Sequence, residues 1–174
     1  NGVVMTQSEQ EQIVWQGRFI TTKTKGTWEY VSRARGIKAA VILAVDDGHV
    51  LLVEQFRVPL GVSCLELPAG LIGDETDNEV MEEAAARELE EETGYRPGRI
   101  ELVGEFYSSP GMVSESFFFV RAHDLVKTGA GGGVDGENIT VHRVPLAEVA
   151  DFMAIKRTEG CAMDAKLLML LELV

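Results

Sequence analysis

The sequence predicts a mixed α/β fold, a sandwich in which strands lie before and after a central helix and a second helix ends the chain. Apolar, β-branched runs recur on both sides of one acidic helical segment, turn residues separate these runs, and the last residues are rich in leucine. This order is typical of a mixed sheet covered by helices and not of a regular βαβ array. The 174 residues, 45% of them apolar, suffice for one domain with a single core.

The predicted strands fall into a short N-terminal strand segment, residues 1–35, and a longer remainder, residues 36–174. The two N-terminal strands flank a polar turn expected at residues 21–26. Asp46-Asp47-Gly48 is a hairpin signal between two later apolar runs. In chain order, the strands are expected at residues 13–19, 28–33, 39–45, 50–55, 65–67, 100–107, 116–122 and 139–144.

One acidic helix is predicted in the middle of the chain. Thr76 and Glu79 have the spacing of a capping box at its start, and Gly94 suits its end. Ala85 and Leu89 give the helix an apolar side that can lie against a sheet. Glu79 therefore has a structural role of its own and ranks below the other glutamates as a ligand.

Two further segments follow from composition. Residues 164–174 carry leucines on most of a helical surface, so a buried terminal helix is expected there. Residues 129–136 are mostly glycine, which broadens backbone freedom, and a mobile surface loop is expected.

Charge and composition narrow the class of protein. A net charge of −12 argues against nucleic-acid binding, which depends on Lys and Arg. No run of 18 apolar residues and no secretory signal pattern is evident, so we expect a soluble cytoplasmic protein with no membrane partner. Cys64 and Cys161 lack metal-site spacing and are expected to be buried, reduced thiols.

The acidic helix carries the main chemical signal. Glu88, Glu91 and Glu92 are spaced i, i+3 and i+4, which places three carboxylates on one helix face. Such like charges repel each other unless a cation lies between them, and acidic helices are more often simply solvated. Carboxylate oxygens suit Mg²⁺, which also binds waters and substrate phosphate oxygens. The pattern predicts half of a site whose other half is a phosphate ligand.

The full spacing of residues 73–95 is G-x5-E-x7-R-E-U-x-E-E-x-G-U, where U is apolar, and it includes Gly73. This pattern resembles the Nudix box, the signature of hydrolases that cleave a nucleoside diphosphate linked to another moiety. The resemblance implies a Nudix α/β/α sandwich as a single domain, with residues 36–174 as catalytic core. It also implies Mg²⁺, with Mn²⁺ as a possible substitute.

A second set of residues resembles the ADP-ribose pyrophosphatase subfamily. Pro110 lies fifteen residues after Tyr95, at the offset that marks these enzymes, although Ser109-Pro110-Gly111 is also an ordinary turn signal. Met112, which follows this turn, is placed among the substrate-binding residues by the same resemblance.

Residues 51–57 and 65–72 are similar to the strand and the box-approach segment of the same enzymes. The resemblance implies that Arg57 contacts the diphosphate and that the backbone carbonyl of Ala69 is a metal ligand. A guanidinium can hold two phosphate oxygens in a fork. Alternatively, Arg57 is a surface salt-bridge residue.

Residues 27–33 resemble the segment that recognises adenine. The resemblance implies that Trp28 stacks on the base, Glu29 accepts from its exocyclic amine and Arg33 approaches the phosphates. Phe19 stands where a second aromatic, contributed by the partner subunit, is expected, although a larger tryptophan is common there. Exchange of the N-terminal strands would make the protein a homodimer with composite sites. Without the resemblance, Trp28 would be assigned to core or interface packing.

The catalytic base is expected on the glycine-rich loop. Glu137 matches the family position best, with Asp135 as the alternative, and a carboxylate there could orient water. A solvated hairpin tip is the other interpretation. Arg87, beside the carboxylates, is expected to fix the orientation of a glutamate.

The sequence therefore predicts Mg²⁺-dependent hydrolysis of the diphosphate bond of ADP-ribose to AMP and ribose 5-phosphate. Another nucleoside diphosphate sugar or an oxidised nucleoside diphosphate is an alternative substrate, because stacking alone tolerates several bases. A non-catalytic module that senses ADP-ribose is a third interpretation, which the intact set of box glutamates disfavours.

Overall fold

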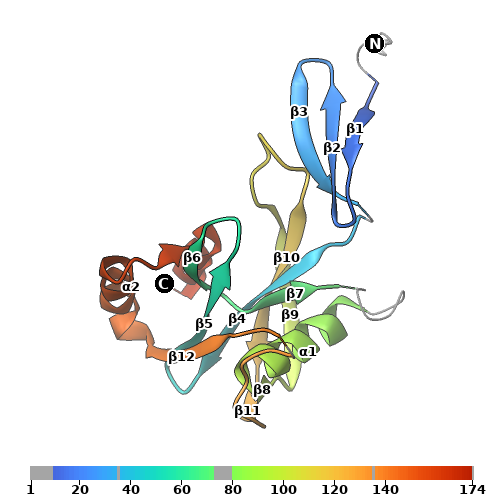
Figure 1. The fold of residues 1–174 in the computed structure, drawn as a ribbon. Coiled ribbons are helices and arrows are strands. Elements are labelled where there is room, and N and C mark those ends of the chain that lie inside the picture. The colour runs from blue at the N-terminus through green and yellow to red at the C-terminus, as the bar shows by residue number, and fades with distance from the viewer. Residues whose placement is uncertain (1–9, 35, 73–79, 135, 174) are drawn as a thin grey trace.

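The computed structural model describes residues 10–34, 36–72, 80–134 and 136–173, with side chains up to Leu170. Within these residues the body of the protein is an eight-stranded sheet in the order β13-β6-β5-β4-β10-β9, with β12 paired to β5 and β7 paired to β4 (Figure 1). Its strands are β4 (Ala39–Asp46), β5 (His49–Arg57), β6 (Val62–Glu66), β7 (Ala69–Leu71), β9 (Arg99–Tyr107), β10 (Ser116–His123), β12 (Thr140–Pro145) and β13 (Ala162–Met163).

Strand β4 is the centre of this sheet. It runs parallel to β10, with Phe117 opposite Ala39, and antiparallel to β7, with Ala69 opposite Val41. Strands β5 and β12 are antiparallel, and β6 and β13 are parallel. Both pairing directions occur, so the predicted α/β class with a mixed sheet is confirmed.

Alternate residues of β4 enter different cores on the two faces of the sheet. Val41 and Leu43 pack in one cluster, whereas Ala40 and Ile42 pack in the other. Helix α1 (Met81–Thr93) covers the second cluster with Ala85 and Leu89. The first is covered by α2 (Val149–Thr158) and the 3₁₀ helix η3 (Ala165–Leu173), so helices lie on both faces. A strand buried on both faces is mostly apolar, as β4 is from Ala39 to Val45.

Helix α1 ends where the sequence predicts. Gly94 is left-handed, with φ 75°, and its N–H donates to the Glu90 carbonyl at 2.8 Å. At the other end the N-cap is Val80, which makes no side-chain capping bond. Gly73, Thr76 and Glu79 lie outside the described residues.

A separate three-stranded antiparallel sheet precedes the main sheet and projects from it in Figure 1. It contains β1 (Gln12–Gln16), β2 (Ile20–Lys25) and β3 (Trp28–Arg33). The polar turn predicted at residues 21–26 is wrong, because these residues are mostly β2. Its threonines are β-branched and favour a strand despite their polarity. The first strand also ends earlier, since the Gly17 N–H donates to the Ile20 carbonyl in a turn.

The C-terminal prediction also needs correction. Helix α2 was not expected, although Val149, Phe152 and Met153 have the spacing of an apolar helix face and pack on the sheet. Residues 165–173 form a 3₁₀ helix in which Leu167 is buried but Leu168 is 67% exposed. The burial expected over most of this helix is therefore only partial. Val174 lies outside the described residues.

The remaining elements are the short 3₁₀ helix η2 (Leu146–Glu148) and a small sheet of β8 (Tyr95–Arg96) and β11 (Val126–Lys127). Cys64 and Cys161 are free and buried, as expected. In the described part of the chain, no helix has the length and apolar character needed to cross a membrane.

Candidate active site

A cavity of about 910 Å³ lies between helix α1, strands β5, β6 and β7, and the loop at residues 108–115. Most of the predicted site residues meet in it, although sequence positions as distant as 33 and 137 contribute. Its charged lining residues are Arg33, Arg57, Glu66, Glu88, Glu92, Glu115, Glu137, Asp164 and Lys166.

The helix presents its carboxylates unequally. Glu92 is 5% exposed, and its Oε2 accepts a hydrogen bond from the Ala69 N–H at 3.0 Å. Glu88 also lines the cavity, whereas Glu91 does not. Arg87 Nη1 donates to Glu88 Oε1 at 3.0 Å and to Glu91 Oε2 at 3.2 Å. Arg87 thus contacts both flanking carboxylates, in keeping with an orienting role.

Burial raises the pKa of Glu92 to about 8. The hydrogen bond from Ala69 opposes this rise, and the nearby charges of Glu88, Glu137 and Glu66 add to it. Four carboxyl groups therefore crowd one place in a protein that is already acidic. A cation at this place would remove the repulsion.

The donor set fits a hard divalent cation. Among the described residues, no three His, Cys, Asp or Glu side chains form a ready-made metal cluster. The two glutamates that line the cavity, Glu88 and Glu92, could supply one or two carboxylate ligands, as Mg²⁺ usually takes from a protein, with waters and phosphate oxygens completing its shell.

Gly70 on β7 sets the position of Glu88. A Cβ atom at Gly70 would overlap the Glu88 Cγ, Cδ and Oε1 atoms, so the glutamate lies directly against the glycine backbone. The glycine of Pro68-Ala69-Gly70 is thereby a steric requirement of the site.

The glycine-rich loop, expected to be a mobile surface loop, is anchored to the end of α1 through residues 131–133. Gly132 and Gly133 donate their N–H groups to the Glu92 and Glu91 carbonyls at 2.8 and 3.0 Å. These carbonyls belong to the last helical turn and lack partners within the helix. Gly131 has φ 71°, and any Cβ there would overlap the Thr93 backbone. The glycines permit close contact with the helix.

This anchored loop brings Glu137 into the cavity. Glu137 Oε2 accepts a hydrogen bond from the Val134 N–H at 3.1 Å, and a side chain at Gly133 would collide with the same oxygen. Glu137 is near enough to Glu92 to raise its pKa. Asp135 lies outside the described residues.

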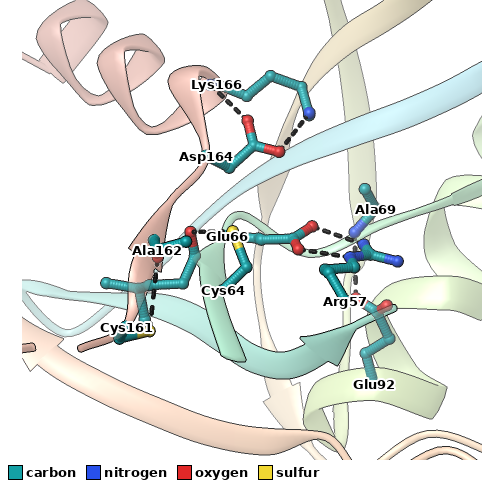
Figure 2. Close-up of polar contacts among 10 residues, drawn as sticks. Arg57, Cys64, Glu66, Ala69, Glu92, Cys161, Ala162, Asp164 and Lys166 are labelled. Atoms are coloured by element: carbon teal, nitrogen blue, oxygen red, sulfur yellow. Dashed lines mark hydrogen bonds and ion pairs between the residues drawn. The ribbon is translucent and has the colours of Figure 1, made fainter. Parts of the chain in front are cut away.

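Arg57 approaches the cavity already paired. Its Nε and Nη2 donate to the two carboxylate oxygens of Glu66, each at 2.6 Å (Figure 2). Glu66 is not among the site residues predicted from the sequence. The available signal was a lone charge in the apolar run Cys64-Leu65-Glu66-Leu67, because such a residue must have a partner if it is buried.

Arg33 and Met112 also line the cavity, together with Glu115. Arg33 Nε donates to Glu115 Oε1 at 2.6 Å. The 108–115 loop is joined to β3, since the Val31 N–H donates to the Met112 carbonyl at 3.0 Å. The N-terminal sheet and this cavity wall are therefore one connected unit.

The predicted adenine residues do not meet within one chain. Trp28 is 61% exposed and lines a separate hollow of about 290 Å³ with Pro110, while Phe19 is 65% exposed. In the β2–β3 register, Trp28 lies opposite Lys25, whereas Phe19 precedes the other end of the hairpin. Ile20 and Lys25, the two ends of β2, are about 17 Å apart along the strand, and Phe19 lies beyond Ile20. Glu29 is exposed and follows Trp28 directly, so it faces the opposite side of β3.

Comparison with known proteins agrees with this geometry. The sequence profile described as the NUDIX domain matches residues 34–164, which contain the cavity-lining residues apart from Arg33, Ala165 and Lys166. The chain belongs to the Nudix family. The predictions of family and of a hydrolase are thereby confirmed, and Nudix hydrolases in general use divalent metal cations.

Two curated relatives indicate the kinds of Nudix enzyme that the chain is similar to. The GDP-mannose pyrophosphatase of Pectobacterium atrosepticum is 36% identical over 133 residues, 72% of this chain and 65% of that protein. The ADP-ribose pyrophosphatase of Bacillus subtilis is 40% identical over 86 residues, 49% of this chain and 45% of that protein.

A solved structure described as an ADP compounds hydrolase superposes with a TM-score of 0.68 at 25% identity, covering 83% of this chain and 80% of its own. The Nudix fold is therefore shared beyond the box helix.

The contact between Gly70 and Glu88 gives a steric prediction. Gly70→Ala should lower kcat about a hundredfold, because a displacement of about 1 Å in a positioned group can cost that much. The melting temperature should change little, since only a flexible side chain must move. Gly104→Ala is the matched control, because its Cβ would meet Phe106 at 3.4 Å. Equal kcat values for Gly70→Ala and Gly104→Ala would contradict the role of Gly70 in placing Glu88.

The raised pKa of Glu92 gives a pH prediction for the protein in EDTA. Its folded pKa of about 8 exceeds the model-peptide value of 4.5, so the folded state binds the extra proton between these values. The free energy of unfolding should therefore fall as pH rises from about 4.5 to 8. Glu92→Gln should flatten this fall. Urea denaturation at several pH values measures the free energy of unfolding. Parallel pH curves for the unmodified protein and for Glu92→Gln would refute this prediction.

Proposed function

We propose that this Nudix hydrolase cleaves the diphosphate bond of ADP-ribose, releasing AMP and ribose 5-phosphate, with Mg²⁺ as its metal. The observation that carries the proposal is the composition of one cavity, in which Glu88, Glu92 and Glu137 lie with Arg33 and Arg57. Carboxylates for a divalent cation and guanidiniums for a diphosphate are the two parts that such a hydrolysis needs.

Each residue has a defined task in this proposal. Glu88 and Glu92, with Glu91 and the Ala69 carbonyl, would hold Mg²⁺ or Mn²⁺. When bound, the cation neutralises developing charge and lowers the pKa of its water. Glu137 accepts the proton of the attacking water, and Arg57 and Arg33 hold the diphosphate oxygens.

The base-binding part of the site is proposed to be shared between two copies of the chain. Trp28 and Phe19 are exposed and too far apart to hold one base from both sides within a chain. In a homodimer that places the N-terminal sheet of one protomer against the other, Trp28 could stack on adenine with Phe19 of the other protomer opposite. Glu29 would then accept from the exocyclic amine, and Met112 would contact the substrate.

GDP-mannose is the second candidate substrate. Relatives named GDP-mannose pyrophosphatase match 71% to 79% of this chain, more than the 49% matched by the ADP-ribose enzyme of Bacillus subtilis. A carboxylate such as Glu29 can accept hydrogen bonds from the N–H groups of either purine. An oxidised nucleoside diphosphate has no such support. A non-catalytic sensor is disfavoured because Glu88, Glu92 and Glu137 all line the cavity.

A substrate panel separates these candidates. ADP-ribose, GDP-mannose, UDP-glucose and 8-oxo-dGDP would be incubated with Mg²⁺, and the products separated by chromatography. ADP-ribose should give the highest kcat/KM and yield AMP and ribose 5-phosphate, and EDTA should abolish turnover. A higher value for GDP-mannose would transfer the proposal to that substrate, and no turnover of any compound would refute it.

Two variants test which carboxylate of the glycine-rich loop is the catalytic base. Glu137→Gln should lower kcat about 10²–10⁴-fold, the usual contribution of a general base. Thermal stability should hold, because the loop is anchored by its glycine N–H groups. Asp135→Asn is the matched control and should have a small effect. A larger loss for Asp135→Asn would move the base by two residues, and no loss for either would exclude the loop.

A further inference from the structure

Glu66 and Arg57 form an ion pair of unequal exposure. The Glu66 side chain is 5% exposed and that of Arg57 is 42% exposed. Both carboxylate oxygens are engaged, by Nε and by Nη2, in the planar fork that guanidinium and carboxylate groups favour. The carboxylate is thus fixed in the protein, while the guanidinium lies at the cavity wall.

The strand register shows that this pair is not a simple cross-strand contact. Arg57 lies opposite Val62, whereas Glu66 lies opposite Val53, four residues earlier on β5. That offset is about 13 Å along the strand. The Arg57 side chain must therefore turn back along the sheet face on which Gln55 and Cys64 line the cavity.

This turn brings the guanidinium close to the carboxylate centre. Figure 2 shows Arg57 directed toward Glu66, on the side where Ala69 and Glu92 lie. The pKa of Arg57 is raised first by its bond to Glu66 and, against the effect of burial, also by the charge of Glu92. A long, flexible arginine at the end of a strand would otherwise extend into solvent.

We propose that Glu66 is a positioning residue, whose buried carboxylate holds the Arg57 guanidinium in the place and plane from which it binds the substrate diphosphate. A guanidinium has five N–H donors, and Glu66 engages two of them, so three are left for phosphate oxygens. The inference rests on the proposed function in taking a diphosphate as the ligand.

Two other roles for Glu66 make different predictions. As a metal ligand, Glu66 would act whether or not Arg57 is present, and its loss would raise the Mg²⁺ concentration needed for activity. As a purely structural residue, it would affect unfolding but not KM. Only the positioning role makes the effect of Glu66 depend on Arg57.

A double-mutant cycle tests this dependence. Glu66→Gln keeps the shape of the side chain but loses the charge and one acceptor, and it should raise KM about tenfold to a hundredfold, the range of a lost charge-assisted bond. Arg57→Ala should raise KM at least as much. The double variant should match Arg57→Ala alone, with the Mg²⁺ dependence of kcat unchanged throughout.

Asp46→Asn is the matched control. It removes the charge of an arginine-bound carboxylate outside the cavity, since Arg143 Nη2 lies 3.1 Å from Asp46 Oδ2, and it should leave KM unchanged. If the Glu66→Gln protein does not fold, the Arg57→Lys variant is used in its place to test the same contact. Lysine preserves the charge opposite Glu66 but cannot form the fork, so KM should rise while the melting temperature holds.

Binding of inorganic pyrophosphate with Mg²⁺, measured by calorimetry in the four proteins of the cycle, gives a readout that needs no substrate. If no nucleotide sugar is hydrolysed but the pyrophosphate affinities are non-additive, the proposed function fails and the positioning role holds. Additive losses, a shifted Mg²⁺ dependence, or an unchanged KM with lowered stability would each overturn the positioning role.

Discussion

Helix α1 must satisfy two opposite environments on neighbouring faces, and the arrangement of the site depends on this. Leu89 and Ala85 are fully buried against the sheet, while Glu88 and Glu92 enter the cavity beside them. One helix register meets both demands, because positions 85, 88, 89 and 92 recur at helical spacing. Any rotation that improved the solvation of Glu92 would expose Leu89. Apolar packing therefore holds a carboxylate where it is poorly solvated.

In this protein of net charge −12, the arginines at or beside the cavity are each paired with carboxylates. Arg57 is paired with Glu66, Arg33 with Glu115, and Arg87 with Glu88 and Glu91. These arginines are held in position, but their charges are already balanced. The remaining carboxylates around Glu92 leave the cavity negative, so we expect an anionic substrate to enter together with divalent cations. The charge balance of the cavity therefore favours a divalent cation for the same reason as its carboxylate ligands do.

The sequence was most informative where function depends on local spacing. The carboxylate face of α1, its end at Gly94 and the mixed sheet could all be predicted from periodicity and turn residues. Glu66 could not, because its partner is set by the register of two strands, and the sequence does not reveal the backward turn of Arg57. Strand β2 was missed because its threonines look like turn residues when only polarity is considered. The separation of Phe19 from Trp28 likewise depends on a hairpin register.

The glycines have a different role in the structure from the one that composition predicts. By composition, residues 129–136 indicate mobility, yet Gly131 lies against the last turn of α1, and Gly132 and Gly133 donate to its open carbonyls. Gly70 similarly receives Glu88 where any side chain would exclude it. Both glycine segments therefore act by close approach to the same helix, one at the carboxylate face and one at the C-terminal end. Their common effect is to bring Glu137 and Glu88, from distant parts of the chain, to the same buried carboxylate, Glu92.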